Sequence, residues 1–120
     1  MNPPRSVIEL AQALVRIPSV NPDGDPGCAK TGEADIAAFV ADFLRRCGAE
    51  VTLEEVLPNR PNAIGRFRTE PSPGGRPKPR IVLGPHLDTV GVGGMTIDPF
   101  GAEVRDGKLW GRGACDTKGP

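Results

Sequence analysis

The 120-residue sequence has little of several features that would each point to a class of protein. Fifteen basic residues balance fifteen acidic ones, so charge gives no support to binding of nucleic acid or a membrane surface. No long apolar run is present, and we therefore expect neither a signal peptide nor a membrane span. The three cysteines are odd in number and lack the spacing of a metal site, which favours reduced thiols and a cytoplasmic location.

Two stretches show helical patterns. Over residues 6–17, Ser6 opens a capping box, and apolar residues then recur at helical spacing until Pro18 ends the pattern. A second helix is expected over residues 31–47, with acidic residues in its first turn and basic residues in its last, as the helix dipole favours. Each apolar face is interpreted as packing.

Two further stretches show hairpin patterns. Residues 51–57 partly alternate between apolar and polar, and residues 62–68 follow after a short turn, which predicts an antiparallel pair. The strongest short hairpin signal lies at residues 104–109, where Asp106 and Gly107 suit a two-residue turn.

The apolar run at residues 81–83 is uninterrupted, as expected of a strand buried on both faces of a parallel sheet. Together, these elements predict an α/β fold, a layered α/β/α domain with a mixed, largely parallel sheet. Ligands of such sheets bind beyond the carboxyl ends of the strands. We therefore expect a functional site just after residue 83.

The only histidine, His86, lies at this predicted edge. Asp88 is two residues further on, so in an extended chain both side chains leave on the same side. Imidazole is a good zinc ligand, and a nearby carboxylate can hold its second nitrogen and fix its tautomer. Asp116 lies in a glycine-rich loop after the second predicted hairpin and can fold back to share a metal with His86. The pattern predicts His86 and Asp116 as ligands and Asp88 as the group that orients His86.

Other interpretations of these residues stay open. A single histidine is more often an ordinary surface or core residue, and the His-x-Asp pattern often occurs by chance. Cys115 is either a soft additional ligand or, as we favour, a small residue that fits the loop. The glycine-rich loop with Lys118 lacks the order Gly-Lys-Ser/Thr of a phosphate-binding loop. The two aspartates of segment 21–27 are interpreted as turn formers rather than ligands.

Several motifs, in order, resemble the signatures of the M20 family of metallopeptidases and deacylases. They are HLDTV at 86–90, DPF at 98–100 and DGKLWGRGACDTKG at 106–119, preceded by LVRIPSVNP at 14–22, which resembles the family's opening helix and the loop after it. The resemblance implies that His86 is the first ligand of one zinc, that the catalytic Asp88 orients it, and that Asp116 bridges two zincs. Cobalt and manganese are the alternative metals.

The resemblance also implies a function and a domain organisation. It implies an enzyme that hydrolyses amide bonds in N-acyl amino acids or small peptides and that has no nucleic-acid or membrane partner. A homodimer is one possible oligomeric state of the complete protein. Residues 1–120 would form the N-terminal part of the catalytic domain. In the family, the general base, the remaining ligands and a smaller dimerisation or lid domain follow this region, so we expect the isolated chain to be an inactive fragment.

A second hypothesis comes from a different class of function. His86 and Asp116 supply two ligands, whereas a catalytic zinc usually takes three from the protein. The alternative is therefore a short non-catalytic domain that binds a metal weakly or binds a partner.

Overall fold

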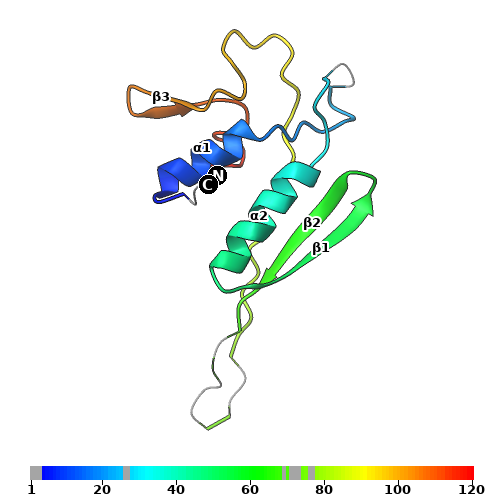
Figure 1. Ribbon diagram of the computed structural model, residues 1–120, viewed down its shortest axis with the longest axis vertical. Coiled ribbons are helices and arrows are strands. Elements are labelled where there is room, and N and C mark those ends of the chain that lie inside the picture. Colours follow the sequence, from blue (N-terminus) through cyan, green and yellow to red (C-terminus); the bar gives the residue numbers. More distant parts are fainter. Residues whose placement is uncertain (1–3, 26–27, 69, 71–73, 76–77) are drawn as a thin grey trace.

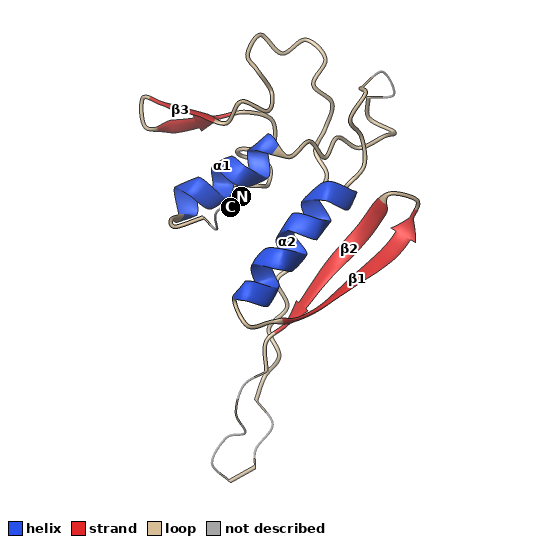
Figure 2. Cartoon of the chain, viewed as in Figure 1, coloured by secondary structure: helices blue, strands red, loops and turns tan. Residues whose placement is uncertain are grey.

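The computed structural model describes residues 4–25, 28–68, 70, 74–75 and 78–120 (Figures 1 and 2). Pro26 and Gly27 of the predicted turn segment lie outside the described residues. The elements in chain order are α1 (Val7–Arg16), α2 (Ala34–Arg46), β1 (Glu50–Leu57), β2 (Arg60–Arg66), β3 (Glu103–Arg105) and β4 (Lys108–Trp110). Helix α2 packs against the β1–β2 hairpin, and α1 lies near the β3–β4 hairpin (Figure 1). No helix of the described part has the length and apolar character needed to cross a membrane.

Both predicted helices are confirmed. The Ser6 hydroxyl caps α1 by accepting a hydrogen bond from the Glu9 amide at 3.1 Å, and the helix ends where Ile17, before Pro18, turns extended. Helix α2 begins two residues later than a Thr31 cap would place it, with Glu33 at the N-cap. Glu33 makes no cap hydrogen bond there because its carboxylate binds an arginine of the hairpin.

Both predicted hairpins are confirmed as well. Strands β1 and β2 pair antiparallel, as do β3 and β4, and the two sheets are separate. Asp106 and Gly107 have φ values of 52° and 71°, the positive pair that a two-residue hairpin turn of the mirror-image type requires. The tight turn reverses the chain, so β4 runs back alongside β3.

The predicted buried strand at residues 81–83 is not formed, which corrects that expectation. The side chains of Ile81, Val82 and Leu83 are 82%, 81% and 86% exposed, and the segment belongs to neither sheet. A parallel strand exists only when neighbouring strands flank it, and the described residues supply none at this segment. The α/β class holds, but the described residues form two antiparallel hairpins instead of a layered, largely parallel sheet.

An ion pair joins the start of α2 to the start of β2. The Arg60 guanidinium donates to both carboxylate oxygens of Glu33, at 2.7–3.1 Å, and Glu33 is only 6% exposed. These hydrogen bonds are the main cause of the raised pKa of Arg60, and the charges of Glu33, Asp88 and Asp23 raise the pKa further. The ion pair therefore ties the start of β2 to the N-terminal end of α2.

Candidate functional site

The segment that carries His86 and Asp88 is fixed by backbone hydrogen bonds to the residues just after α1. Thr89 donates its amide to the Ser19 carbonyl at 2.9 Å and accepts from the Asn21 amide at 2.8 Å, while the Ser19 hydroxyl donates to the Leu87 carbonyl at 2.7 Å. Ser19 and Val20 are completely buried, and Thr89 is 3% exposed. The segment is therefore anchored on both sides of Asp88.

The loop that carries Asp116 follows β4 and is anchored separately. Lys118, 7% exposed, donates its Nζ to the Ile17 carbonyl at the end of α1 at 2.6 Å and its amide to the Gly113 carbonyl at 2.8 Å. Burial lowers the pKa of the Lys118 ammonium to about 8. The same end of α1 thus supports both segments of the site.

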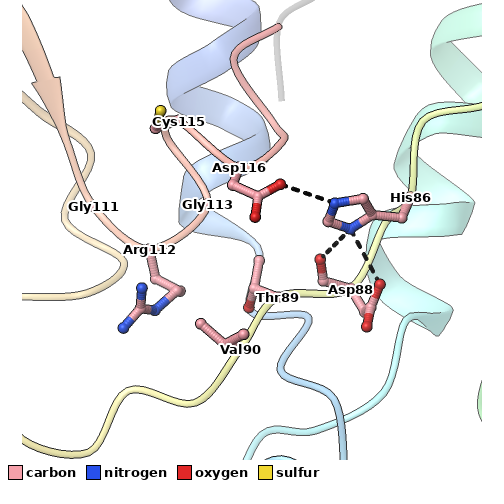
Figure 3. A pocket seen from close by; sticks show the side chains of 9 residues that line it. All are labelled: His86, Asp88, Thr89, Val90, Gly111, Arg112, Gly113, Cys115 and Asp116. Atoms are coloured by element: carbon pink, nitrogen blue, oxygen red, sulfur yellow. Dashed lines mark hydrogen bonds and ion pairs between the residues drawn. The ribbon is translucent and has the colours of Figure 1, made fainter.

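The three residues predicted for the site lie together (Figure 3). His86 Nε2 is 3.0 Å from Asp116 Oδ1, although the two residues are thirty positions apart. The other ring nitrogen, Nδ1, is 2.9 Å from the Asp88 carbonyl oxygen and 3.2 Å from the Asp88 carboxylate. The imidazole is half exposed and Asp116 is 83% exposed, so the site opens to solvent. The roles predicted for these residues stay predictions.

The sequence interpretation missed one residue of this site. Asn21 donates its Nδ2 to Asp88 Oδ2 at 3.0 Å, across 67 positions of the chain. The pattern of segment 21–27 indicated only a turn. In such a turn, Asn21 Oδ1 does accept a hydrogen bond from the Asp23 amide. No local signal distinguishes a turn-forming asparagine from one that also reaches a distant carboxylate.

A pocket of about 220 Å³ lies between the two segments, and Figure 3 shows the side chains that line it. His86, Asp88 and Asp116 form one side, and the lining also includes Thr89, Val90, Gly111, Arg112, Gly113 and Cys115. The pocket therefore brings the three site residues together with a guanidinium and a thiol. A small polar molecule can reach the imidazole there.

Both ring nitrogens of His86 face oxygen atoms, and this raises the pKa of the imidazole above its ordinary value of about 6.5. The hydrogen bond to Asp116 is the largest cause, followed by the bond to the Asp88 carbonyl, and burial acts in the opposite direction. Each acceptor favours a proton on the nitrogen that it faces.

We expect an NMR titration of this single histidine to give a midpoint above about 6.5, and Asp116→Asn to move it back toward that value. Because the pKa is higher in the folded chain, the protonated ring stabilises the fold fully below about pH 6.5, and this stabilisation is lost as the pH rises through the folded-state pKa. Asp35→Asn, at an exposed position of α2, is the control and should leave the midpoint unchanged. A wild-type midpoint at or below about 6.5 would contradict these contacts.

The donor set fits a zinc ion. Two ligands that are each about 2.0–2.1 Å from a tetrahedral zinc lie about 3.3 Å apart, close to the separation of His86 Nε2 and Asp116 Oδ1. A metal bound at Nε2 would need the ring proton on Nδ1, where Asp88 can accept it. The described part of the chain holds no group of three or more His, Cys, Asp or Glu side chains placed to bind a metal. His86 and Asp116 would therefore supply two of the ligands of such an ion.

Comparison with known proteins shows which family this part of the chain is similar to. Residues 82–120 match the model of the peptidase family M20/M25/M40, and these residues contain all three side chains of the site. The expected resemblance to the M20 family is therefore confirmed.

Individual relatives extend the match to nearly the whole chain. The chain is 38% identical to the succinyl-diaminopimelate desuccinylase of Methylobacterium radiotolerans over 97% of its length, and 38% identical to that of Beijerinckia indica over 95%. It is 37% identical to the desuccinylase of Gluconacetobacter diazotrophicus over 93% of its length. The matched region covers 27%, 27% and 26% of those three relatives, so the chain spans about a quarter of their length.

Proposed function

We propose that this chain is the N-terminal part of the catalytic domain of a metal-dependent hydrolase that cleaves amide bonds in N-acyl amino acids or small peptides. The observation that carries the proposal is the contact of His86 Nε2 with Asp116 Oδ1 at 3.0 Å, with Asp88 behind the other ring nitrogen. The match of residues 82–120 to a peptidase family supports the same conclusion. Since the relatives named above are desuccinylases, an N-succinyl amino acid is the first substrate to test.

Each of the three residues has a distinct part in the proposed reaction. Asp88 faces His86 Nδ1 with its carbonyl oxygen at 2.9 Å and its carboxylate at 3.2 Å, and would hold the ring with Nε2 turned toward the metal. Asp116 supplies an anionic oxygen beside Nε2 and would hold the metal together with His86. When bound, zinc polarises the scissile carbonyl and makes water a stronger nucleophile near neutral pH. Cobalt and manganese accept similar ligands and are the alternatives.

The proposal includes the surroundings of the site. We propose that residues 81–83 are a strand of a layered, largely parallel sheet in the complete catalytic domain, supported by their exposed apolar side chains and by the parallel bridge of Val20 with Thr89. The remaining ligands, the general base and a smaller dimerisation domain would come from the region that the relatives have beyond the matched quarter. The three free cysteines support a reducing compartment, for which we propose the cytoplasm.

A hydrolysis assay tests the proposal. We expect the full-length gene product, loaded with zinc or cobalt, to hydrolyse N-succinyl or N-acetyl amino acids or dipeptides, and a chelator to abolish this activity. Asp88→Asn should lower activity about tenfold to a hundredfold, the usual effect of losing a residue that orients a metal ligand. Asp23→Asn is the matched control because the Asp23 side chain is 94% exposed. The proposal fails if no such substrate is cleaved and His86→Ala leaves the metal content unchanged.

One observation favours a second candidate, a short non-catalytic domain that binds a metal weakly or binds a partner. The described residues offer no group of three or more ligand-type side chains, and a site with two ligands should exchange its metal readily. Turnover by the isolated 120-residue chain, abolished by a chelator, would count against this candidate.

A further inference from the structure

Asn21 stands behind Asp88 at the side away from His86. Its Nδ2 donates to Asp88 Oδ2 at 3.0 Å, while the other oxygen of that carboxylate, Oδ1, is 3.2 Å from His86 Nδ1. Each carboxylate oxygen of Asp88 therefore contacts a different residue. A carboxylate with one oxygen held cannot rotate freely, so the contact from Asn21 fixes the direction in which the other oxygen points.

Asn21 is itself held firmly. Its side-chain oxygen accepts the Asp23 amide at 3.0 Å, and its own amide donates to the Thr89 carbonyl at 2.8 Å. A backbone N–H can only donate, so the amide oxygen of Asn21 must face Asp23 and its NH₂ group must face Asp88. The neighbouring Val20 is completely buried. The orientation of the donor is thus set by the backbone.

We infer that Asn21 is a positioning residue for the metal centre, which acts by holding the Asp88 carboxylate in the orientation that directs His86. The inference rests on the proposed function, because it assigns His86 as a metal ligand. The chain of contacts runs from Asn21 Nδ2 through the two carboxylate oxygens of Asp88 to His86 Nδ1, across the ring from Nε2. Loss of the Asn21 side chain should therefore loosen the Asp88 carboxylate without removing a metal ligand.

The two acceptors around His86 make the inference measurable without metal. A neutral imidazole carries one proton, for which the carbonyl oxygen and the carboxylate of Asp88 at Nδ1 compete with Asp116 at Nε2. When Asp88 is less well held, the proton should spend more time on Nε2. Because His86 is the only histidine, its two ring nitrogens are directly identifiable in the NMR spectrum of the 120-residue chain.

The experiment compares Asn21→Ala, Asn21→Asp and the control Asn62→Ala, whose side chain is exposed on β2. In the metal-free chain at a pH where His86 is neutral, we expect the ring ¹⁵N shifts of both Asn21 variants to move toward the Nε2–H tautomer. Zinc affinity, from competition with a chelator, should fall about threefold to tenfold, less than for a residue that touches the ligand itself. Asn62→Ala should match wild type in both measurements.

A double-mutant cycle separates positioning from a general effect on the fold. In an Asp88→Ala background, Asn21→Ala should have no further effect on zinc affinity, because the group that it positions is gone. Equal losses in both backgrounds, or unchanged ring shifts in variants that keep the wild-type amide spectrum, would overturn the inference. So would loss of the fold in both Asn21 variants, since Asn21 would then be a folding residue. Asn21→Asp keeps the size and the acceptor oxygen, so it is the variant expected to fold.

The same data distinguish this inference from the proposed function. If wild type binds no zinc but the Asn21 variants shift the His86 tautomer, the metal site is wrong and the positioning role stands. If wild type binds zinc and the variants leave the tautomer and the affinity unchanged, the positioning role is wrong and the metal site stands.

Discussion

The His86→Ala variant is expected to lose zinc affinity by a factor of at least about a hundred, beyond the range for a residue that only orients a ligand. His86 supplies the only imidazole of the chain, and its Nε2 faces Asp116 Oδ1 at 3.0 Å. Without it, one exposed carboxylate remains at that position, and a single carboxylate oxygen is a poor zinc site. Competition with a chelator measures the change directly.

Two controls make this result specific to the site. Asp23→Ala removes a carboxylate that is 94% exposed and should leave zinc affinity unchanged. Cys115→Ser removes a thiol that lines the same pocket, next to Asp116. If Cys115 only fits the loop, this variant should also leave zinc affinity unchanged. Zinc affinity within threefold of wild type in His86→Ala would remove His86 from the ligand set.

The Gly113→Ala variant is expected to destabilise the fold by roughly 2–5 kcal/mol. Gly113 has φ of +84°, a left-handed conformation that costs an alanine about 1–2 kcal/mol. A Cβ at this position would also lie 2.9 Å from Thr89 Cγ2 and 2.9 Å from Lys118 Cδ, and crowding of that kind typically costs about 1–3 kcal/mol. Both neighbours are buried, so neither can move aside freely. Denaturant unfolding measures the loss.

Gly48→Ala is the matched control for this substitution. Gly48 has φ of +89°, almost the same conformation, but a Cβ there would meet nothing within 4 Å. The control should therefore lose only the conformational part, about 1–2 kcal/mol. Equal losses in the two variants would show that the crowding against Thr89 and Lys118 has no energetic weight.

Features set by neighbouring residues were predictable from the sequence. The Ser6 cap and Pro18 define α1 through contacts within a few positions, and Asp106 with Gly107 defines a turn through its own backbone preferences. The strand expected at residues 81–83 failed because a parallel strand depends on partners far away in the chain. An apolar run shows that a segment suits burial, but it does not supply the strands that would bury it.

In the site, too, contacts between neighbouring residues were predictable and contacts between distant residues were less so. His86 and Asp88 were predictable as neighbours because two positions separate them, and the glycine-rich loop with its hairpin indicated that Asp116 would return to them. The contact of Asn21 with Asp88 was not predictable, because it depends on the register between two segments 67 positions apart. Only the packing of residues 19–21 beside residues 87–89 establishes that register.

The tether of the site to the end of α1 has a consequence for the order of folding. Ser19 bonds to Leu87 across 68 positions, and Lys118 bonds to Ile17 across 101. Contacts of such long sequence separation form slowly, because a large loop must close before they provide any stabilisation. During synthesis, α1 leaves the ribosome long before Lys118 does. The contacts of α1 with the site therefore form only after residues 87–118 have been synthesised.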